Sequence, residues 1–262
     1  MKRLISALLA LTLVLALAGC AGNREPGGTI TPKNEDTQET TTAPAEETTA
    51  PAEETAAPVE ETAAPIEETT APTVSLGRME GGVYTNEYAG FACSLDETWE
   101  YYTAEELQDL SDLTQEQLQD SALAEQAGKF DQITDMMAES YENLATINVN
   151  YTRLSATERL SFALTSEEAL IDTTLQQKDL LMQTYAQAGI NATGMEKTQV
   201  TFLGEEHFAI HTVADIEGTP YYILQLFRYN LGGPYYVTMT LSSFVEDKTA
   251  ELLDLFAPYS ED

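Results

Sequence analysis

Cysteine, histidine and basic residues are scarce in this chain. Its 262 residues include two cysteines and two histidines, and 12 Lys and Arg residues stand against 44 Asp and Glu residues, for a net charge of −32. Two cysteines cannot build a disulfide framework. A chain this acidic repels phosphate backbones, so the sequence predicts no nucleic-acid binding.

Catalytic and nucleotide-binding signatures are missing as well. The sequence has no G-x-S-x-G elbow, no G-x-G-x-x-G turn, no P-loop and no EF-hand loop. We therefore assign no catalytic, cofactor-binding or metal-binding residue and predict no cofactor. Long apolar runs are missing too: residues 4–18 form the longest one, at 15 residues. A membrane-spanning helix needs about 20.

This short apolar run has the pattern of an export signal. Lys2 and Arg3 precede it, and Leu17-Ala18-Gly19-Cys20 closes it. Signal-peptide cores hold about 7–15 apolar residues after a basic start. The cysteine directly after Leu-Ala-Gly resembles the lipobox of bacterial lipoproteins. That resemblance implies cleavage between Gly19 and Cys20, acylation of Cys20 by chains such as palmitate, and a lipid anchor on the outer face of the cell membrane. An ordinary secretory signal with an unmodified cysteine is the alternative.

Residues 20–78 have almost nothing to bury. All 22 aromatic residues lie after residue 78, and residues 41–68 are four copies of one unit: TTAPAEE, TTAPAEE, TAAPVEE and TAAPIEE. A proline in every copy would break a helix every second turn, so this period of seven is not a coiled coil. It predicts an extended, disordered linker of up to roughly 180 Å, at about 3.1 Å per residue.

We expect this linker to act as a spacer that holds a C-terminal domain away from the membrane. A linker of no required length, and a carrier of glycans on its threonines, are the alternatives. Residues 79–262 form the predicted domain, with 32 acidic and 7 basic residues. Its acidic surface is interpreted as solvated, with attraction of cationic partners or divalent cations left open. Cys93, between Phe91 and Leu95 on one strand face, is predicted to be a buried, inert thiol.

Hydrophobic periodicity in residues 79–262 predicts an α+β fold. Strands are expected at 83–85, 91–95, 130–138, 145–153, 195–203, 206–216, 220–230 and 234–242. Strand 220–230 is apolar on both faces and should lie inside the sheet. Capping pairs predict helices from Thr103, Thr114 and Thr165, the last one long and ending before Gly189, and a final helix covers 245–256. This order implies a mainly antiparallel sheet with helices on both faces.

The start of this domain is similar to that of PsbP-like domains. Residues 84–91, Tyr-Thr-Asn-Glu-Tyr-Ala-Gly-Phe, followed by Leu95 and Trp99, match their aromatic hairpin, turn and tryptophan. The long helix, four-strand meander and closing helix match too. The resemblance implies an αβα sandwich and a partner-binding role without catalysis.

Three other patterns suggest chemistry but have structural explanations. His207 and His211 would share a metal on a helix, yet on a strand four residues span roughly 13 Å, so no metal site is predicted. Neighbouring acidic residues point apart, which argues against glycosidase-like carboxylate pairs. Tyrosine pairs place one ring on each sheet face, favouring core packing over a binding surface. The acidic pairs are 105–106, 167–168 and 205–206, and the tyrosine pairs are 101–102, 221–222 and 235–236.

The sequence thus predicts a monomeric, lipid-anchored, extracytoplasmic binding or adaptor lipoprotein. Its partners would be the membrane, through acylated Cys20, and an envelope protein or cell-wall component that the sequence does not identify. The alternative is a hydrolase of cell-envelope material without a recognisable motif.

Overall fold

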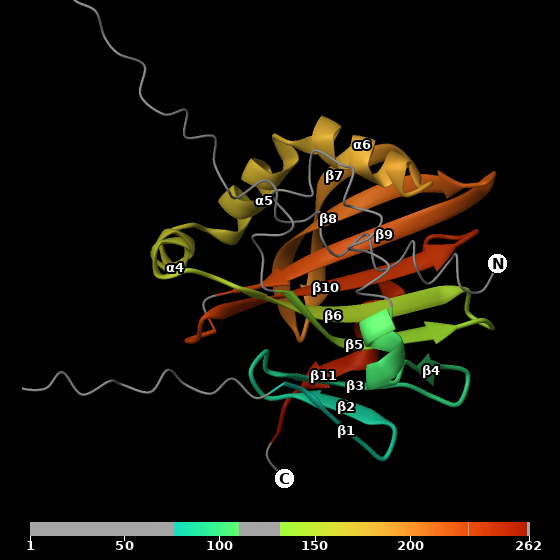
Figure 1. Cartoon of the computed structure of the whole chain (residues 1–262), viewed down its shortest axis with the longest axis horizontal. Coiled ribbons are helices and arrows are strands. Elements are labelled where there is room, and N and C mark those ends of the chain that lie inside the picture. The colour runs from blue at the N-terminus through green and yellow to red at the C-terminus, as the bar shows by residue number, and fades with distance from the viewer. Residues whose placement is uncertain (1–75, 110–131, 230, 261–262) are drawn as a thin grey trace, which may run out of the picture. The chain divides into compact units, whose positions relative to one another are not determined.

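A computed structural model of the chain describes residues 76–109, 132–229 and 231–260. Within these residues the fold is α+β with antiparallel sheets (Figure 1). Seven strands form the large sheet in the order β4-β5-β6-β10-β9-β8-β7. Their bounds are Glu100–Tyr101 (β4), Gln132–Ser140 (β5), Ala145–Arg153 (β6), Asn191–Phe202 (β7), Glu205–Ile216 (β8), Thr219–Arg228 (β9) and Tyr235–Phe244 (β10).

A second sheet has four short strands in the order β1-β2-β3-β11. They are Arg78–Glu80, Val83–Asn86, Phe91–Ser94 and Phe256–Pro258. The β2–β3 hairpin confirms the expected one. Its turn forms because Asn86 accepts from the Ala89 N–H at 2.8 Å, and Gly90 adopts the left-handed φ of 79° that glycine tolerates.

Most expected strands are confirmed, with small shifts of their ends. The bounds of β6 are those predicted, and β5 is displaced by two residues toward the C-terminus. β9 lies between β8 and β10, as expected for a strand apolar on both faces. Tyr221 and Ile223 enter one core, and Leu224 and Leu226 enter the other.

The helices differ from the expectation between residues 155 and 189. One long helix from Thr165 is wrong: α5 (Glu167–Leu175) and α6 (Lys178–Gln187) are separate, and Gln177 between them has non-helical backbone angles. The N-cap is Ser166, because the Thr165 hydroxyl donates instead to the Ser161 carbonyl at 2.8 Å. A further helix, α4 (Ala156–Ala163), begins at the Ser155 capping box and was not expected from the sequence.

Two other predicted helices have different outcomes. The Thr103 cap is confirmed: its backbone N–H and hydroxyl both donate to Glu106, at 2.8 Å, and residues 104–109 are helical. The helix predicted from Thr114 lies outside the described residues.

The predicted closing helix over 245–256 is wrong. Val245 has a left-handed φ of 71°, which a helix does not accommodate, and its N–H donates to the Pro220 carbonyl. Only a short 3-10 helix, η2 (Glu251–Leu255), follows. Phe256 then leaves it to pair with Cys93 of β3 in the small sheet.

The two faces of the large sheet bury different cores. On one face, α4, α5 and α6 contribute side chains such as Phe162, Ile171 and Leu181; Figure 1 shows α5 and α6 along β7 and β8. On the other, the small sheet and η2 contribute residues such as Phe91 and Leu252. The expectation of helices on both faces is therefore corrected: in the described part of the chain, a sheet and one short 3-10 helix make the second layer.

Candidate functional site

The helix-covered face of the large sheet carries a buried group of polar side chains, here called the polar face. It is defined by Asn148, Asn150 and Thr152 of β6, Thr238 and Thr240 of β10, Gln225 of β9 and Thr212 of β8. Side chains alternate along a strand. Since Ile147 and Val149 enter the opposite core, Asn148 and Asn150 must point toward the helices.

Strand pairing joins the polar side chains of β6, β10 and β9, whereas Thr212 of β8 lies opposite the apolar Ile223. Asn150 lies opposite Thr238, and Asn148 lies opposite Thr240. Thr240 in turn lies opposite Gln225 on β9. Directly opposed residues on one face have Cβ atoms about 4.5–5.5 Å apart. The sheet thus gathers amide and hydroxyl groups that are far apart in the chain.

Several polar atoms in this region lack a partner, although Asn150 Nδ2 donates to Asn148 Oδ1 at 2.8 Å. Asn148, Asn150, Thr152, Thr212 and Thr240 are all 0% exposed. The buried atoms without a hydrogen-bond partner in the described residues include six from this face and the helical layer over it: Asn148 Nδ2, Asn150 Oδ1, Thr152 Oγ1, Thr212 Oγ1, Thr240 Oγ1 and Tyr185 Oη. The last comes from α6, in the helical layer over this face.

The cost of such groups makes the polar face unusual. A buried polar group left unsatisfied costs about 1–3 kcal/mol. Six of them together approach the entire net stability of an ordinary domain, about 5–15 kcal/mol. Buried polar groups in folded proteins are nearly always bonded to protein, ordered water or a ligand. The polar face is therefore the strongest candidate for a functional site in the described part of the chain.

The chemistry of the polar face is neutral. Its seven side chains are amides and hydroxyls, with no carboxylate, imidazole or ammonium group among them. A buried ion would therefore find no countercharge there, and burying an unpaired ion is costly. No group of three or more His, Cys, Asp and Glu side chains in the described residues could hold a metal ion.

Neighbouring polar groups show what a satisfied site looks like in the same sheet. Thr146 and Ser242 are hydrogen-bonded across β6 and β10 at 2.6 Å, and the Tyr221 hydroxyl donates to Ser242 at 2.9 Å. These three groups share bonds and have no unpartnered atom. Thr146, Ser242 and Tyr221 thus satisfy one another within the protein, unlike the unpartnered atoms of the polar face.

A second polar cluster lies where β8 and β9 separate. Glu167, the first residue of α5, accepts from the Phe208 backbone N–H at 2.9 Å and from His207 Nδ1–H at 2.9 Å. His207 Nε2 faces Arg228 Nη1 at 3.4 Å. Burial lowers the pKa of Arg228, while the negative charges of Glu205 and Glu167 oppose that shift. This cluster joins the start of α5 to the sheet.

The two histidines do not form a pair, as the sequence indicated. His211 Nε2 lies 2.8 Å from Asp247 Oδ2, whereas His207 contacts Glu167. Both imidazoles lie on β8, but each has its own acidic partner from a different segment.

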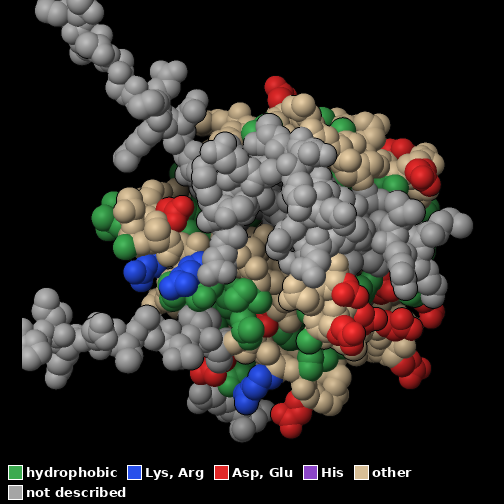
Figure 2. All heavy atoms as spheres, viewed as in Figure 1, with side chains coloured by type: hydrophobic (Ala, Val, Ile, Leu, Met, Phe, Trp, Pro, Cys, Tyr) green, Lys and Arg blue, Asp and Glu red, His purple; other side chains and the backbone are tan. Residues whose placement is uncertain are grey.

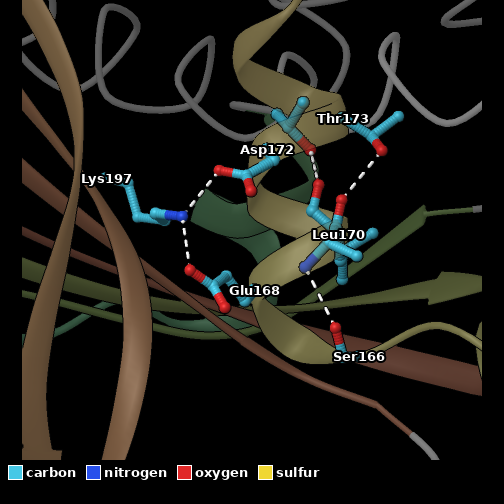
Figure 3. A network of polar contacts seen from close by, with 8 residues as sticks. Ser166, Glu168, Leu170, Asp172, Thr173 and Lys197 are labelled. Carbon is cyan, nitrogen blue, oxygen red and sulfur yellow. Dashed lines mark hydrogen bonds and ion pairs between the residues drawn. The ribbon is translucent and has the colours of Figure 1, made fainter.

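Lys197 of β7 also holds α5 against the sheet (Figure 3). Its ammonium lies 2.9 Å from Glu168 and 2.8 Å from Asp172, one helical turn further along. Glu167 and Glu168 thus point to different partners, as expected for adjacent acidic residues. Because Lys197 is partly exposed, these ion pairs position α5 more than they stabilise it.

Acidic side chains also gather on the surface of the domain. Figure 2 shows Asp and Glu side chains outnumbering Lys and Arg side chains on the face in view. The excess agrees with the acidic composition of residues 79–262.

The other residues that the sequence singled out have mixed outcomes. Cys93 is completely buried in the core between the sheets, as predicted. Tyr221 and Tyr236 are buried, while their neighbours Tyr222 and Tyr235 are half-buried. The pair 101–102 divides between the two cores. Gly19 and Cys20 lie outside the described residues.

The polar side of β6 is visible in the sequence, but its role is not. Asn148, Asn150 and Thr152 alternate with apolar residues, which normally indicates a solvent-exposed face. The available signal was the matching alternation of Thr238 and Thr240 between the apolar residues of β10. These two matching patterns favour pairing of β6 and β10 with their polar sides on one face.

No protein-family model matches this chain, and no curated protein matches it.

None of the described helices has both the length and the apolar character needed to cross a membrane.

Proposed function

We propose that this protein is a lipid-anchored, extracytoplasmic binding lipoprotein. The observation that carries the binding role is the polar face, because its unpartnered groups favour a bound molecule. The basic start, apolar core and Leu-Ala-Gly-Cys ending of residues 1–20 support the anchor at Cys20. The repeats of residues 41–68 would hold the domain away from the membrane.

We further propose that the domain is a variant of the PsbP-like αβα sandwich. The antiparallel sheet, the helices over one face and the aromatic β2–β3 hairpin support this assignment. In the variant, the small sheet and η2 replace most of the second helical layer.

The hydrolase alternative gains no specific support from the cluster around Glu167. A His–carboxylate pair acts as a base when its free ring nitrogen faces a nucleophile or a water. Here His207 Nε2 faces the cationic Arg228 at 3.4 Å. A binding role therefore remains the better supported proposal.

The anchor is tested by changing Cys20→Ser and fractionating the cells. We expect the wild-type chain in the membrane fraction and the variant in the soluble fraction, because acyl chains supply the binding energy at about 0.8 kcal/mol per buried CH₂. Incorporation of a labelled palmitate analogue should disappear with the same change.

Cys93→Ser is the matched control. Its side chain is buried between the sheets, so this variant should keep both the label and the membrane location. Equal membrane recovery of the Cys20→Ser and wild-type chains would contradict the proposed anchor.

A further inference from the structure

We propose that the polar face binds a neutral saccharide, a ligand rich in hydroxyl and N-acetyl groups. This inference rests on the proposed binding role and names its ligand class. It starts from the unpartnered atoms, which include both donors and acceptors: Asn148 Nδ2 can only donate, and Asn150 Oδ1 can only accept.

The mixture of donors and acceptors selects among ligands. A carboxylate or phosphate offers acceptors alone and would leave Asn150 Oδ1 unmet, whereas an ammonium group or metal ion would leave Asn148 Nδ2 unmet. The threonine hydroxyls both donate and accept. A sugar hydroxyl has the same dual capacity, so a saccharide can satisfy every group without bringing a charge.

The absence of charged side chains on the polar face points the same way. Its seven residues are neutral, and residues 79–262 carry a large excess of acidic groups. An anionic ligand would be repelled by the domain and left unpaired when buried. The ligand class is accordingly uncharged as well as polar.

The extent and borders of the polar face determine the contact that a saccharide could make. Its directly paired polar residues span three neighbouring strands, β6, β10 and β9, which is roughly 10 Å at about 4.8 Å per strand spacing. Aromatic rings border it: Phe162 stacks on Tyr236 with ring centroids 5.5 Å apart, and Tyr185 comes from α6. These rings place apolar surface beside hydrogen-bonding groups, and a saccharide presents both kinds of surface.

The test uses the full-length chain in a sugar-free non-ionic detergent. Thermal unfolding gives its unfolding temperature, and titration calorimetry gives its affinity for each probe. Triacetylchitotriose and maltotriose are the neutral probes, with sialyllactose as the acidic comparison and blocked trialanine as the peptide comparison. Because the polar face is closed to solvent, each mixture is equilibrated overnight. We expect a neutral trisaccharide to raise the unfolding temperature and the two comparison compounds to leave it unchanged.

The discriminating variant is Thr240→Val, which removes an unpartnered hydroxyl and nearly keeps the side-chain volume. We expect the unliganded unfolding temperature to stay equal or rise, because no protein hydrogen bond is lost. Affinity for the bound trisaccharide should fall about two- to tenfold, the effect of one neutral hydrogen bond. Thr146→Val is the matched control, since Thr146 is bonded to Ser242: its unfolding temperature should fall while affinity is retained.

Two results would overturn the inference. The first is no stabilisation by either neutral trisaccharide, or stabilisation by the peptide or the acidic sugar instead. The second is a loss of stability in Thr240→Val equal to that in Thr146→Val without a change in affinity, which would mean that ordered water alone satisfies the hydroxyl. Neither readout depends on Cys20, so failure here is separate from failure of the proposed anchor.

Discussion

Cys93 illustrates at the residue scale how burial controls chemistry. It lies on β3 opposite Tyr84 of β2 and Phe256 of β11, and it is completely buried. Because the charged thiolate loses its hydration there, burial raises the pKa of the thiol to about 12. The residue is therefore a small apolar group of the core instead of a nucleophile.

This predicts a clear difference in thiol reactivity. In the Cys20→Ser chain, Cys93 is the only cysteine, and at pH 8 about one thiol in 10⁴ would be ionised. We expect iodoacetamide to label the native protein very slowly and the guanidinium-denatured protein completely, as measured by intact mass. Rapid labelling of the native chain would show that Cys93 is accessible and contradict the structure.

The start of α5 shows at the element scale how one hydroxyl decides where a helix begins. Ser166 accepts from the Ala169 backbone N–H at 3.2 Å, and Glu167 and Glu168 lie in the first turn, where acidic side chains favour the helix dipole. Both acidic side chains also contact the sheet, through Phe208, His207 and Lys197. The cap therefore sets both the helix and its attachment.

Ser166→Ala is expected to lower the free energy of unfolding by about 1 kcal/mol, the usual cost of losing an N-cap. Urea denaturation measures this change. Thr165→Ala is the neighbouring control, and it should cost less because Thr165 makes an exposed bond to the Ser161 carbonyl. The reverse order of effects would support the cap position expected from sequence.

At the scale of the whole molecule, Asp135 links the two sheets. It sits at the bulge of β5 and accepts from the Gly77 backbone N–H at 2.8 Å and from the Tyr84 hydroxyl. The network continues because Asn86 Nδ2 donates to Tyr84 Oη at 2.7 Å and Tyr151 donates to Asn86 Oδ1 at 2.8 Å. Burial raises the pKa of Asp135, although the hydrogen bonds from Tyr84 and Gly77 oppose the shift.

This raised pKa predicts a pH dependence of stability. The folded state holds the Asp135 proton more tightly than the unfolded state does. The protonated carboxyl therefore stabilises the folded chain fully below the ordinary carboxyl pKa of 3.8, and this stabilisation is lost as the pH rises above that value. Asp135→Asn has no such ionisation. We expect the unfolding free energy of the wild-type chain, relative to the Asn variant, to fall as the pH rises above the ordinary carboxyl pKa of 3.8.

The comparison with Asp135→Asn separates this site from the general repulsion among acidic residues, which both chains share. Urea unfolding at a series of pH values measures the difference. A difference that rises with pH would indicate that the ionised carboxylate is stabilised in the folded protein and would contradict the assignment.

Strands could be predicted better than helices, for reasons visible in particular residues. In β6, alternation of Ile147, Val149 and Tyr151 with polar residues defines the strand locally. In α4, the Ser155–Glu158 capping box was a valid signal, but Leu160 is exposed, as is Leu164 at the C-cap, so no apolar stripe accompanied it. The closing segment was predicted wrongly because Val245 fits a helical stripe by spacing yet has a left-handed backbone.

The sequence by itself determined the strand positions and the placement of the aromatic core after residue 78, because those depend on local spacing and composition. It also supports the anchor and linker as proposals. Only the tertiary structure decided that the polar sides of β6, β10 and β9 are joined in one buried face. Strand register brings Asn148 and Thr240 together from distant parts of the chain, and no local pattern encodes that pairing. For the same reason, the structure alone decided that a second sheet covers the other face, since β11 must return from the end of the domain to pair with β3.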